Sequence, residues 1–182
     1  MLRYFLIFFL FISTSISNAE IKEKIIQNLK DTKNLDFKFE QNVNGKIENG
    51  NCTIEYQKKI FCEYARSNNK ILVSNGKSLV IKTINSYYIY PLEKTPLNLI
   101  LDKNFLINKV KILEEKIVDE NLINFKFVEE NTKINVFFDK KTLNLIGWQT
   151  IDIYQNLSIT FLYSITKNKI LKKNLFKLPI QN

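Results

Sequence analysis

The sequence predicts a mainly β protein: a strongly curved antiparallel half-barrel that does not close, with one helix at its start and a helical interruption in its middle. Apolar and polar residues alternate with a period of two over most of the chain, which is typical of strands with one buried face. The connections between these segments are short, which favours antiparallel neighbours. A single short helix cannot fill a wide concave sheet, so we expect an interior that holds either large side chains or a cavity.

The first 19 residues have the layout of a secretory signal peptide. Arg3 supplies the positive start, and Phe5–Ile12 is an apolar run too short to span a bilayer. Ser17-Asn18-Ala19 offers the small residues that a signal peptidase reads, which predicts cleavage after Ala19. The alternative is an uncleaved N-terminal anchor. Residues 20–182 are then expected to form a single exported domain, long enough to bury a core.

An amphipathic helix is expected over Glu20–Lys33. Its apolar residues recur at helical spacing on one face, with lysines and glutamates elsewhere: Ile21, Ile25, Ile26 and Leu29. From Leu35 the period changes to two. Leu35, Phe37 and Phe39 alternate with charged residues, which predicts a half-buried strand.

Two hairpins and a further strand follow. The polar turn Gln57-Lys58-Lys59 separates two alternating segments, whose in-phase residues are Cys52, Ile54 and Tyr56 before the turn and Ile60, Cys62 and Tyr64 after it. The second hairpin turns at Ser74-Asn75-Gly76-Lys77, where Asn-Gly is the strongest short hairpin signal in the chain. Tyr87–Tyr90 is expected to be the next strand.

The helical interruption reads TPLNLILD, from Thr95 to Asp102. Thr95 is a good N-cap, and Pro96 suits the first helical position because its missing N–H would lack an intrahelical partner. The apolar residues then share one face, which we expect to lie against the sheet: Leu97, Ile100, Leu101 and Phe105.

Strands resume after the interruption. The alternation predicts them at Asn108–Leu113, Leu122–Val128, Ile134–Phe138, Leu143–Asp152, Leu157–Ile165 and near Leu175. The polar residues Asp139-Lys140-Lys141-Thr142 predict a tight turn.

The composition argues against several functions. The charge is +9, from 27 basic and 18 acidic residues. Nearly all the basic residues are lysines spread along the chain, whereas phosphate and base recognition usually needs arginine, so nucleic-acid binding is poorly supported. There is no histidine, so the commonest general base and the commonest zinc ligand are both missing. We expect no catalytic residues, no metal and no cofactor.

The chain has two cysteines, Cys52 and Cys62. They lie in phase and symmetrically about Gln57, so antiparallel pairing of the two strands would place them opposite each other, near disulfide geometry. An oxidising export compartment favours a bond between them. The alternative is two separate buried thiols.

Four segments, in order along the chain, resemble the periplasmic lipoprotein carrier family, LolA. They are Phe39-Glu40-Gln41, ILVSNGKSLVIKT (Ile71–Thr83), YPLEKTPLNLIL (Tyr90–Leu101) and LIGWQTID (Leu145–Asp152). The resemblance implies a half-open sheet whose apolar concave face is closed by a lid of short helices. It also implies a cavity that holds lipoprotein acyl chains, taken from an inner-membrane lipoprotein-releasing transporter and handed to an outer-membrane acceptor.

This chain departs from the family pattern at the lid. Family members commonly carry Arg-Pro at the end of the second strand, where the arginine is thought to latch the lid through hydrogen bonds. The ungapped register puts Tyr56-Gln57 there, and Phe61-Cys62 where Arg-Trp or Asn-Trp is common. A tyrosine hydroxyl is able to donate a hydrogen bond to a lid carbonyl, but it brings no charge.

We therefore expect a monomeric periplasmic carrier of acylated lipoproteins or phospholipid acyl chains. Two alternatives are a lipid- or lipoprotein-sensing adaptor of the same fold, and an interaction domain whose concave face is filled by its own aromatic residues. The expected acyl-chain cavity is formed by Phe37, Phe39, Ile54, Tyr56, Ile60 and Trp148, with Leu97, Ile100 and Leu101 from the lid. Each of these residues also has an ordinary core interpretation.

Overall fold

The computed structural model describes residues 18–118, 121–129, 131–152 and 154–181. The expected signal peptide therefore lies almost entirely outside the described residues. The described chain begins with helix α1 (Asn18–Asp31). No helix in the described ranges has both the length and the apolarity needed to cross a membrane.

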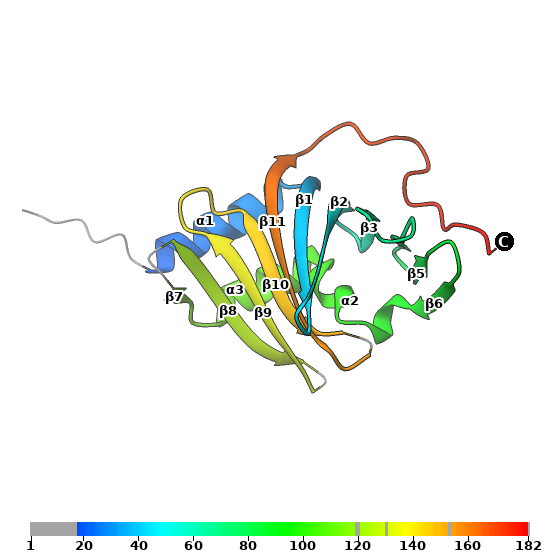
Figure 1. Cartoon of the computed structure of the whole chain (residues 1–182). Coiled ribbons are helices and arrows are strands. Elements are labelled where there is room, and N and C mark those ends of the chain that lie inside the picture. The colour runs from blue at the N-terminus through cyan, green and yellow to red at the C-terminus, as the bar shows by residue number, and fades with distance from the viewer. Residues whose placement is uncertain (1–17, 119–120, 130, 153, 182) are drawn as a thin grey trace, which may run out of the picture.

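Most of the chain forms one 11-stranded antiparallel sheet that is not closed into a barrel (Figure 1), as the alternation predicted. The first half contributes β1 (Asn34–Val43), β2 (Lys46–Glu55), β3 (Lys59–Tyr64), β4 (Ile71–Asn75), β5 (Ser78–Lys82) and β6 (Tyr87–Pro91). The second half contributes β7 (Lys116–Val118), β8 (Leu122–Glu129), β9 (Thr132–Asp139), β10 (Leu145–Ile151) and β11 (Leu157–Lys167).

The strand order is β6-β5-β4-β3-β2-β1-β11-β10-β9-β8-β7. Two meanders are thus joined side by side through one long-range pairing, in which β1 lies antiparallel to β11 with Phe39 opposite Leu162. β6 and β7 are the outer strands of the sheet. Between the two meanders the chain forms the 3-10 helix η1 (Leu92–Lys94), α2 (Leu97–Ile100) and α3 (Lys103–Ile112).

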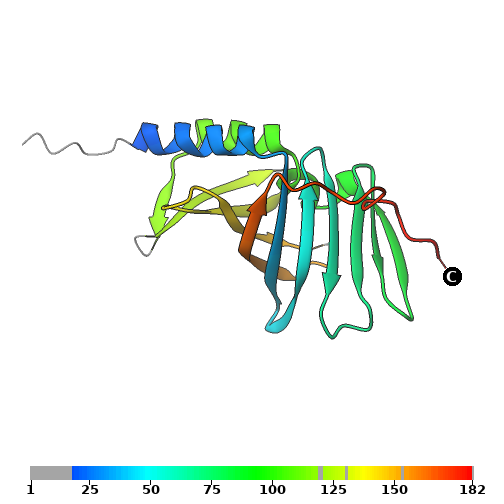
Figure 2. The same ribbon diagram turned by 90° about the horizontal axis from the view of Figure 1, so that it is seen from above.

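The arm of the sheet made by β8, β9 and β10 is filled by helices and large side chains. α1 and α3 lie side by side over it (Figure 2). Their buried residues join one apolar cluster with the inward residues of the strands, such as Ile25 and Leu106 with Phe125 and Phe138. Aromatic edges complete this packing: Phe125 meets Phe138 with ring centroids 5.9 Å apart. Each large side chain buried in this way contributes about 1.5–3 kcal/mol.

The expected strand at Asn108–Leu113 is wrong, because this segment belongs to α3. Asp102 caps the helix, since its Oδ1 accepts a hydrogen bond from the Phe105 N–H at 3.0 Å. Leu106 and Val110, one turn apart, are fully buried on the same face. The alternation of apolar and polar residues in this segment fits the period of a helix as well as that of a strand. The packing of α3 against β8 and α1 favours the helix.

Two smaller expectations also need correction. Thr95 does not cap α2: its hydroxyl donates to the Leu92 carbonyl at 2.8 Å and ends η1, and Pro96 is the N-cap. The region near Leu175 is not a strand. It belongs to a tail that runs across the outside of the first meander (Figure 2).

Contacts with β3, β5 and β6 hold this tail on the convex face. Lys82 Nζ donates to the Ile180 carbonyl at 2.7 Å, and the Tyr87 hydroxyl donates to the Pro179 carbonyl at 3.1 Å. Lys59 Nζ lies 5.8 Å from the centroid of the Phe176 ring. Val73 and Val80, an opposed pair on β4 and β5, are 1% and 0% exposed and do not belong to the interior apolar cluster.

Candidate functional site

A cavity of about 420 Å³ lies within the arm made by β1 to β5. Residues of β10 and β11 also line it, as do Thr95, Pro96 and Leu97 at the start of the lid, the segment Thr95–Asp102. This volume lies within the range of about 300–1,000 Å³ that is usual for small-ligand sites. The apolar part of its wall comprises Phe37, Phe39, Ile60, Leu72, Leu79, Ile81, Leu97 and Trp148. The interior of the sheet is therefore packed on one arm and hollow on the other.

The register of the strands explains which residues face the cavity. Directly opposed residues of an antiparallel sheet point to the same face. Phe37 on β1 is opposite Cys52, which is opposite Cys62, then Leu72 and Ile81 across β3, β4 and β5. This row, one side chain per strand, lines the cavity from β1 to β5.

The structure brings some of the expected cavity residues together and places others elsewhere. Phe37, Phe39, Ile60 and Trp148 line the cavity. Ile54, 0% exposed, lies in the closed core. Tyr56 borders a separate void of about 10 Å³ beside α1. These two do not line the cavity because this end of the sheet is covered by α1 and the lid.

The lid residues divide in the same way. Leu97 is half-buried and lines the cavity, together with Thr95 and Pro96 before it. Ile100 and Leu101 are both 0% exposed and belong to the core cluster. One side of the lid thus faces the hollow, and its later residues anchor it to the protein.

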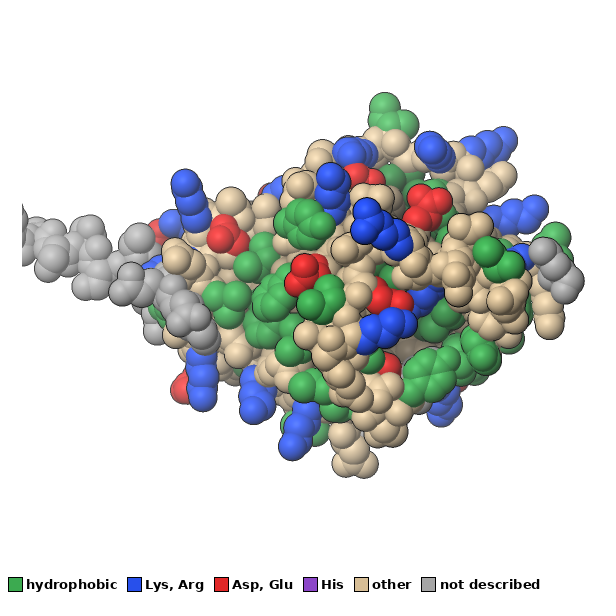
Figure 3. Space-filling model, in the orientation of Figure 1, with side chains coloured by type: hydrophobic (Ala, Val, Ile, Leu, Met, Phe, Trp, Pro, Cys, Tyr) green, Lys and Arg blue, Asp and Glu red, His purple; other side chains and the backbone are tan. Residues whose placement is uncertain are grey.

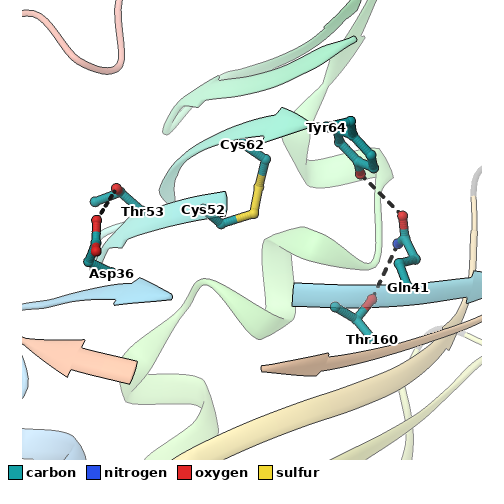
Figure 4. The surroundings of a disulfide bond; sticks show 7 residues. All are labelled: Asp36, Gln41, Cys52, Thr53, Cys62, Tyr64 and Thr160. Carbon is teal, nitrogen blue, oxygen red and sulfur yellow. Dashed lines mark hydrogen bonds between the residues drawn. A yellow bond between two sulfur atoms is a disulfide. The ribbon is translucent and has the colours of Figure 1, made fainter. Parts of the chain in front are cut away.

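Cys52 and Cys62 form a disulfide in the cavity wall (Figure 4). They are directly opposed on β2 and β3, as the sequence symmetry about Gln57 predicted. The turn between them uses left-handed backbone at Gln57 and Lys58, with φ of 96° and 73°. The bond therefore ties two neighbouring strands beneath the lid.

Gly50 allows an aromatic pair to form in the cavity wall. A Cβ at this position would lie 2.0 Å from the Glu63 carbonyl oxygen and 2.9 Å from the Phe39 ring. Without it, Phe39 on β1 reaches Tyr64 on β3, with ring centroids 5.0 Å apart and an edge-to-face arrangement. A side chain at Gly50 would separate the two rings.

A chain of hydrogen bonds continues from this pair along the cavity wall (Figure 4). The Tyr64 hydroxyl donates to Gln41 Oε1 at 3.1 Å. Gln41 Nε2 donates in turn to Ser158 Oγ at 3.1 Å and to Thr160 Oγ1 at 3.2 Å. Burial raises the pKa of the Tyr64 hydroxyl, so it stays protonated and acts as the donor.

An ion pair lies beside this network in the same wall. Glu48, opposite Gln41 on β2, has a side chain only 8% exposed, and its Oε2 lies 2.5 Å from Lys70 Nζ. Lys70 Nζ also lies 3.9 Å from the centroid of the Tyr64 ring, and Lys46 Nζ lies 3.3 Å from Glu48 Oε1. Burial acts to raise the pKa of Glu48, but the hydrogen bonds and charges of Lys70 and Lys46 outweigh it and hold this pKa below its ordinary value.

Replacing Glu48 with Gln is expected to make the protein less stable at neutral pH and to have little effect in acid. A carboxyl whose pKa is lowered on folding contributes stability that is present above its unfolded pKa, 4.5, and is lost as the pH falls through its lower folded pKa. Thermal unfolding of both proteins between about pH 3 and pH 7 measures the difference. A difference in Tm that is the same at every pH would contradict this role.

The lid is anchored without the family arginine. The Tyr56 hydroxyl has no hydrogen-bond partner among the described residues, so it does not replace the latch. The Lys58 N–H instead donates to the Leu101 carbonyl at 3.3 Å, and Lys58 Nζ lies 3.3 Å from Asp102 Oδ2. From the other side, Lys103 Nζ donates to the Thr32 carbonyl at 3.0 Å. The β2–β3 turn therefore holds the lid by one backbone bond and one ion pair.

A hydrogen bond between two tyrosines also joins the two arms of the sheet. The Tyr90 hydroxyl on the outer strand β6 lies 3.0 Å from the Tyr154 hydroxyl in the β10–β11 connection. Tyr154 also lines the cavity. Desolvation and the bond with Tyr90 raise the pKa of Tyr154 to about 12. A neutral, reversible hydrogen bond thus spans the gap between the arms.

Several polar residues of the wall were not predicted from the sequence: Gln41, Glu48, Lys70, Thr150, Ser158 and Thr160. Gln41 had a detectable signal, because it continues the period-two phase of Phe37 and Phe39. The hydroxyls of β11 had none, since they join this wall only through the β1–β11 pairing. On the face seen in Figure 3 the lysines are spread over the surface, as expected, without gathering into one patch.

Several solved structures are similar to this chain at low sequence identity. An uncharacterized conserved protein from Thermus thermophilus is 9% identical with a TM-score of 0.53, and the match covers 90% of this chain and 95% of that one. LprF from Mycobacterium bovis is 14% identical, with a TM-score of 0.47 and coverage of 87% and 97%. The LolA superfamily protein NE2245 from Nitrosomonas europaea is 7% identical, with a TM-score of 0.46 and coverage of 90% and 99%.

No curated protein sequence gives a significant match. The sequence profile of the family described as "Outer membrane lipoprotein carrier protein LolA" matches residues 30–179, which include every strand and the lid. This match agrees with the curved, unclosed sheet, the cavity and the covering helices. The chain belongs to the LolA family of outer membrane lipoprotein carrier proteins.

Proposed function

We propose that this protein is a periplasmic carrier that encloses the acyl chains of lipoproteins in its cavity and transfers them from the inner to the outer membrane. The observation that carries the proposal is a hollow of about 420 Å³ beneath a lid, walled largely by apolar side chains, in a member of a carrier family. Its partners would be an inner-membrane lipoprotein-releasing transporter and an outer-membrane acceptor. The hollow also speaks against an interior filled by the protein's own aromatic residues.

The energetics of such a carrier require both burial and release. Each CH₂ group that leaves water gains about 0.8 kcal/mol, so a fully enclosed acyl chain would bind too tightly to be handed on unless the cavity opens. Among the contacts that close this cavity are two reversible polar ones: the Lys58–Asp102 ion pair at the lid and the Tyr90–Tyr154 hydrogen bond between the arms. Such contacts are individually weak, and breaking them would favour opening of the cavity.

Native mass spectrometry of the exported protein, purified without detergent, is expected to show added masses that correspond to acylated polypeptides or phospholipids. After delipidation, the protein should take up a fluorescent fatty-acyl probe. A bare polypeptide mass combined with no probe uptake would count against the proposal.

A release assay separates a carrier from a lipoprotein-sensing adaptor. The purified protein, added to spheroplasts, should bring newly made lipoprotein into the medium as a stoichiometric complex. Binding of solubilised lipoprotein without any release from spheroplasts would favour the adaptor instead.

A further inference from the structure

The wall of the cavity changes from apolar to polar along the strands. The row made by Phe37, the disulfide, Leu72 and Ile81 is apolar throughout. Four residues further along β1 the corresponding row consists of Trp148, Thr160, Gln41 and Glu48, which are opposed in that order on β10, β11, β1 and β2. The next row contains Thr150 opposite Ser158. All these residues line the same cavity, which therefore has an apolar end and a polar end.

The polar end presents hydrogen-bond donors that have no acceptor in the protein. Ser158 and Thr160 are each only 4% exposed, and both hydroxyl oxygens already accept from the Gln41 amide. Within the described ranges, neither hydroxyl proton has a protein acceptor, and the Thr150 hydroxyl makes no hydrogen bond to the protein. All three hydroxyls border the cavity, where an acceptor atom of a bound ligand could pair with their protons. These three groups are suited to a ligand that brings acceptor oxygens.

The four charged side chains that line the cavity, Glu48, Asp152, Lys46 and Lys70, have charges that sum to zero. Glu48 is paired with Lys70 and Lys46. Asp152 accepts from the backbone N–H groups of Tyr154 and Asn156, each at 2.8 Å. A charged group entering here would lose its hydration without meeting a net opposite charge. The surroundings therefore favour an uncharged group with acceptor oxygens, such as an acyl ester.

We propose that Gln41, Thr150, Ser158 and Thr160 form a subsite for the ester-linked glyceryl end of an acyl ligand, so that the acyl chain lies in the cavity in one direction. Its free end points toward the disulfide and Leu97, and its ester oxygens accept from the hydroxyls of β10 and β11. This inference rests on the proposed function, because it requires that the cavity takes up acyl chains. It adds the chemical class of the ligand head and the direction of binding.

The single tryptophan, Trp148, allows the direction to be measured. Trp148 is opposite Thr160 and lines the cavity at the polar row, so it lies beside the proposed ester subsite. Bromine quenches tryptophan fluorescence at short range. Monoacylglycerols brominated near the ester are expected to quench Trp148 more strongly than those brominated near the chain end. Equal or reversed quenching would overturn the proposed direction, whereas no uptake of any acyl probe would remove the proposed function itself.

Removing the donor hydroxyls tests the chemistry of the head. The double variant Thr160→Val/Ser158→Ala is expected to bind monoacylglycerol about tenfold more weakly, since two hydrogen bonds are lost, and to bind an alkane probe of equal length unchanged. The wild-type protein should prefer monoacylglycerol to the free fatty acid. Thr166→Val, an exposed position on the same strand, is the matched control and should leave both affinities unchanged.

Equal losses for the ester and the alkane probe would overturn the subsite, because they would indicate a change in packing alone. So would an unchanged affinity for monoacylglycerol in a double variant whose thermal unfolding matches that of the wild type. A variant that fails to fold is replaced by Thr150→Val, whose hydroxyl has no protein partner in the described part of the chain; it should weaken ester binding selectively, and no such loss would also overturn the proposal.

Discussion

Leu97→Glu is expected to weaken binding of a fatty-acyl probe about 10- to 100-fold while leaving the protein folded. Leu97 lies on the lid and is one of the apolar residues that line the cavity. A carboxylate there would either enter the hollow unpaired or hold the lid open. The fold should survive because Leu97 is only half-buried and the new side chain can turn into water. Probe titration with a parallel thermal unfolding curve measures both effects.

Asn98→Glu is the matched control, since it adds the same charge one position along the same helix, at a residue that does not line the cavity. It should bind the probe as the wild type does. Ile100→Glu is a different case: Ile100 is 0% exposed within the core, so we expect this variant to unfold. Unchanged affinity in a folded Leu97→Glu protein would show that the lid does not cover the ligand.

Removal of the disulfide by Cys52→Ala/Cys62→Ala is expected to lower the free energy of unfolding by about 3 kcal/mol. The two cysteines are 10 residues apart, and closing a loop of that size restricts the unfolded chain by roughly this amount on the chain-entropy model. For a protein of this length the loss corresponds to a fall in Tm of about 6–12 °C. Differential scanning calorimetry under non-reducing conditions measures it.

Three measurements make the disulfide prediction specific. The intact mass of the wild-type protein should be lower by two hydrogens than its reduced mass. Reduction of the wild type should reproduce the fall in Tm, and the double alanine variant should not respond to reductant. A variant as stable as the wild type would mean that strand pairing alone holds β2 against β3.

Local sequence signals predicted the first meander well because its contacts are between neighbours in the chain. The turn after Tyr56 and the Asn75-Gly76 turn each join strands that follow directly, so phase and turn residues suffice to place Cys52 opposite Cys62. The lid was placed correctly as a covering helix. The same signals failed at Asn108–Leu113, where Val110 and Ile112 alternate with lysines and also fit a helix capped by Asp102.

The candidate site was only partly predictable. Phe37, Phe39, Ile60, Leu97 and Trp148 were named from phase and type, and they do line the cavity. Ile54, Tyr56, Ile100 and Leu101 have the same character but lie where helices close the sheet or anchor the lid. Apolar phase indicates that a residue is buried, and it does not distinguish a packed wall from a hollow one.

The sequence by itself indicated most of the strands, the early hairpins, the opposed cysteines and the presence of a lid, because period, turn residues and spacing act over a few residues. Only the tertiary structure decided which face is concave, which arm is hollow, and that Gln41 meets Thr160, 119 residues away. The physical reason is that an alternation with a period of two shows which side chains share a face of the sheet. It does not show which face is concave or which strand lies alongside. Those follow from the pairing of β1 with β11, which joins the first and last strands of the chain.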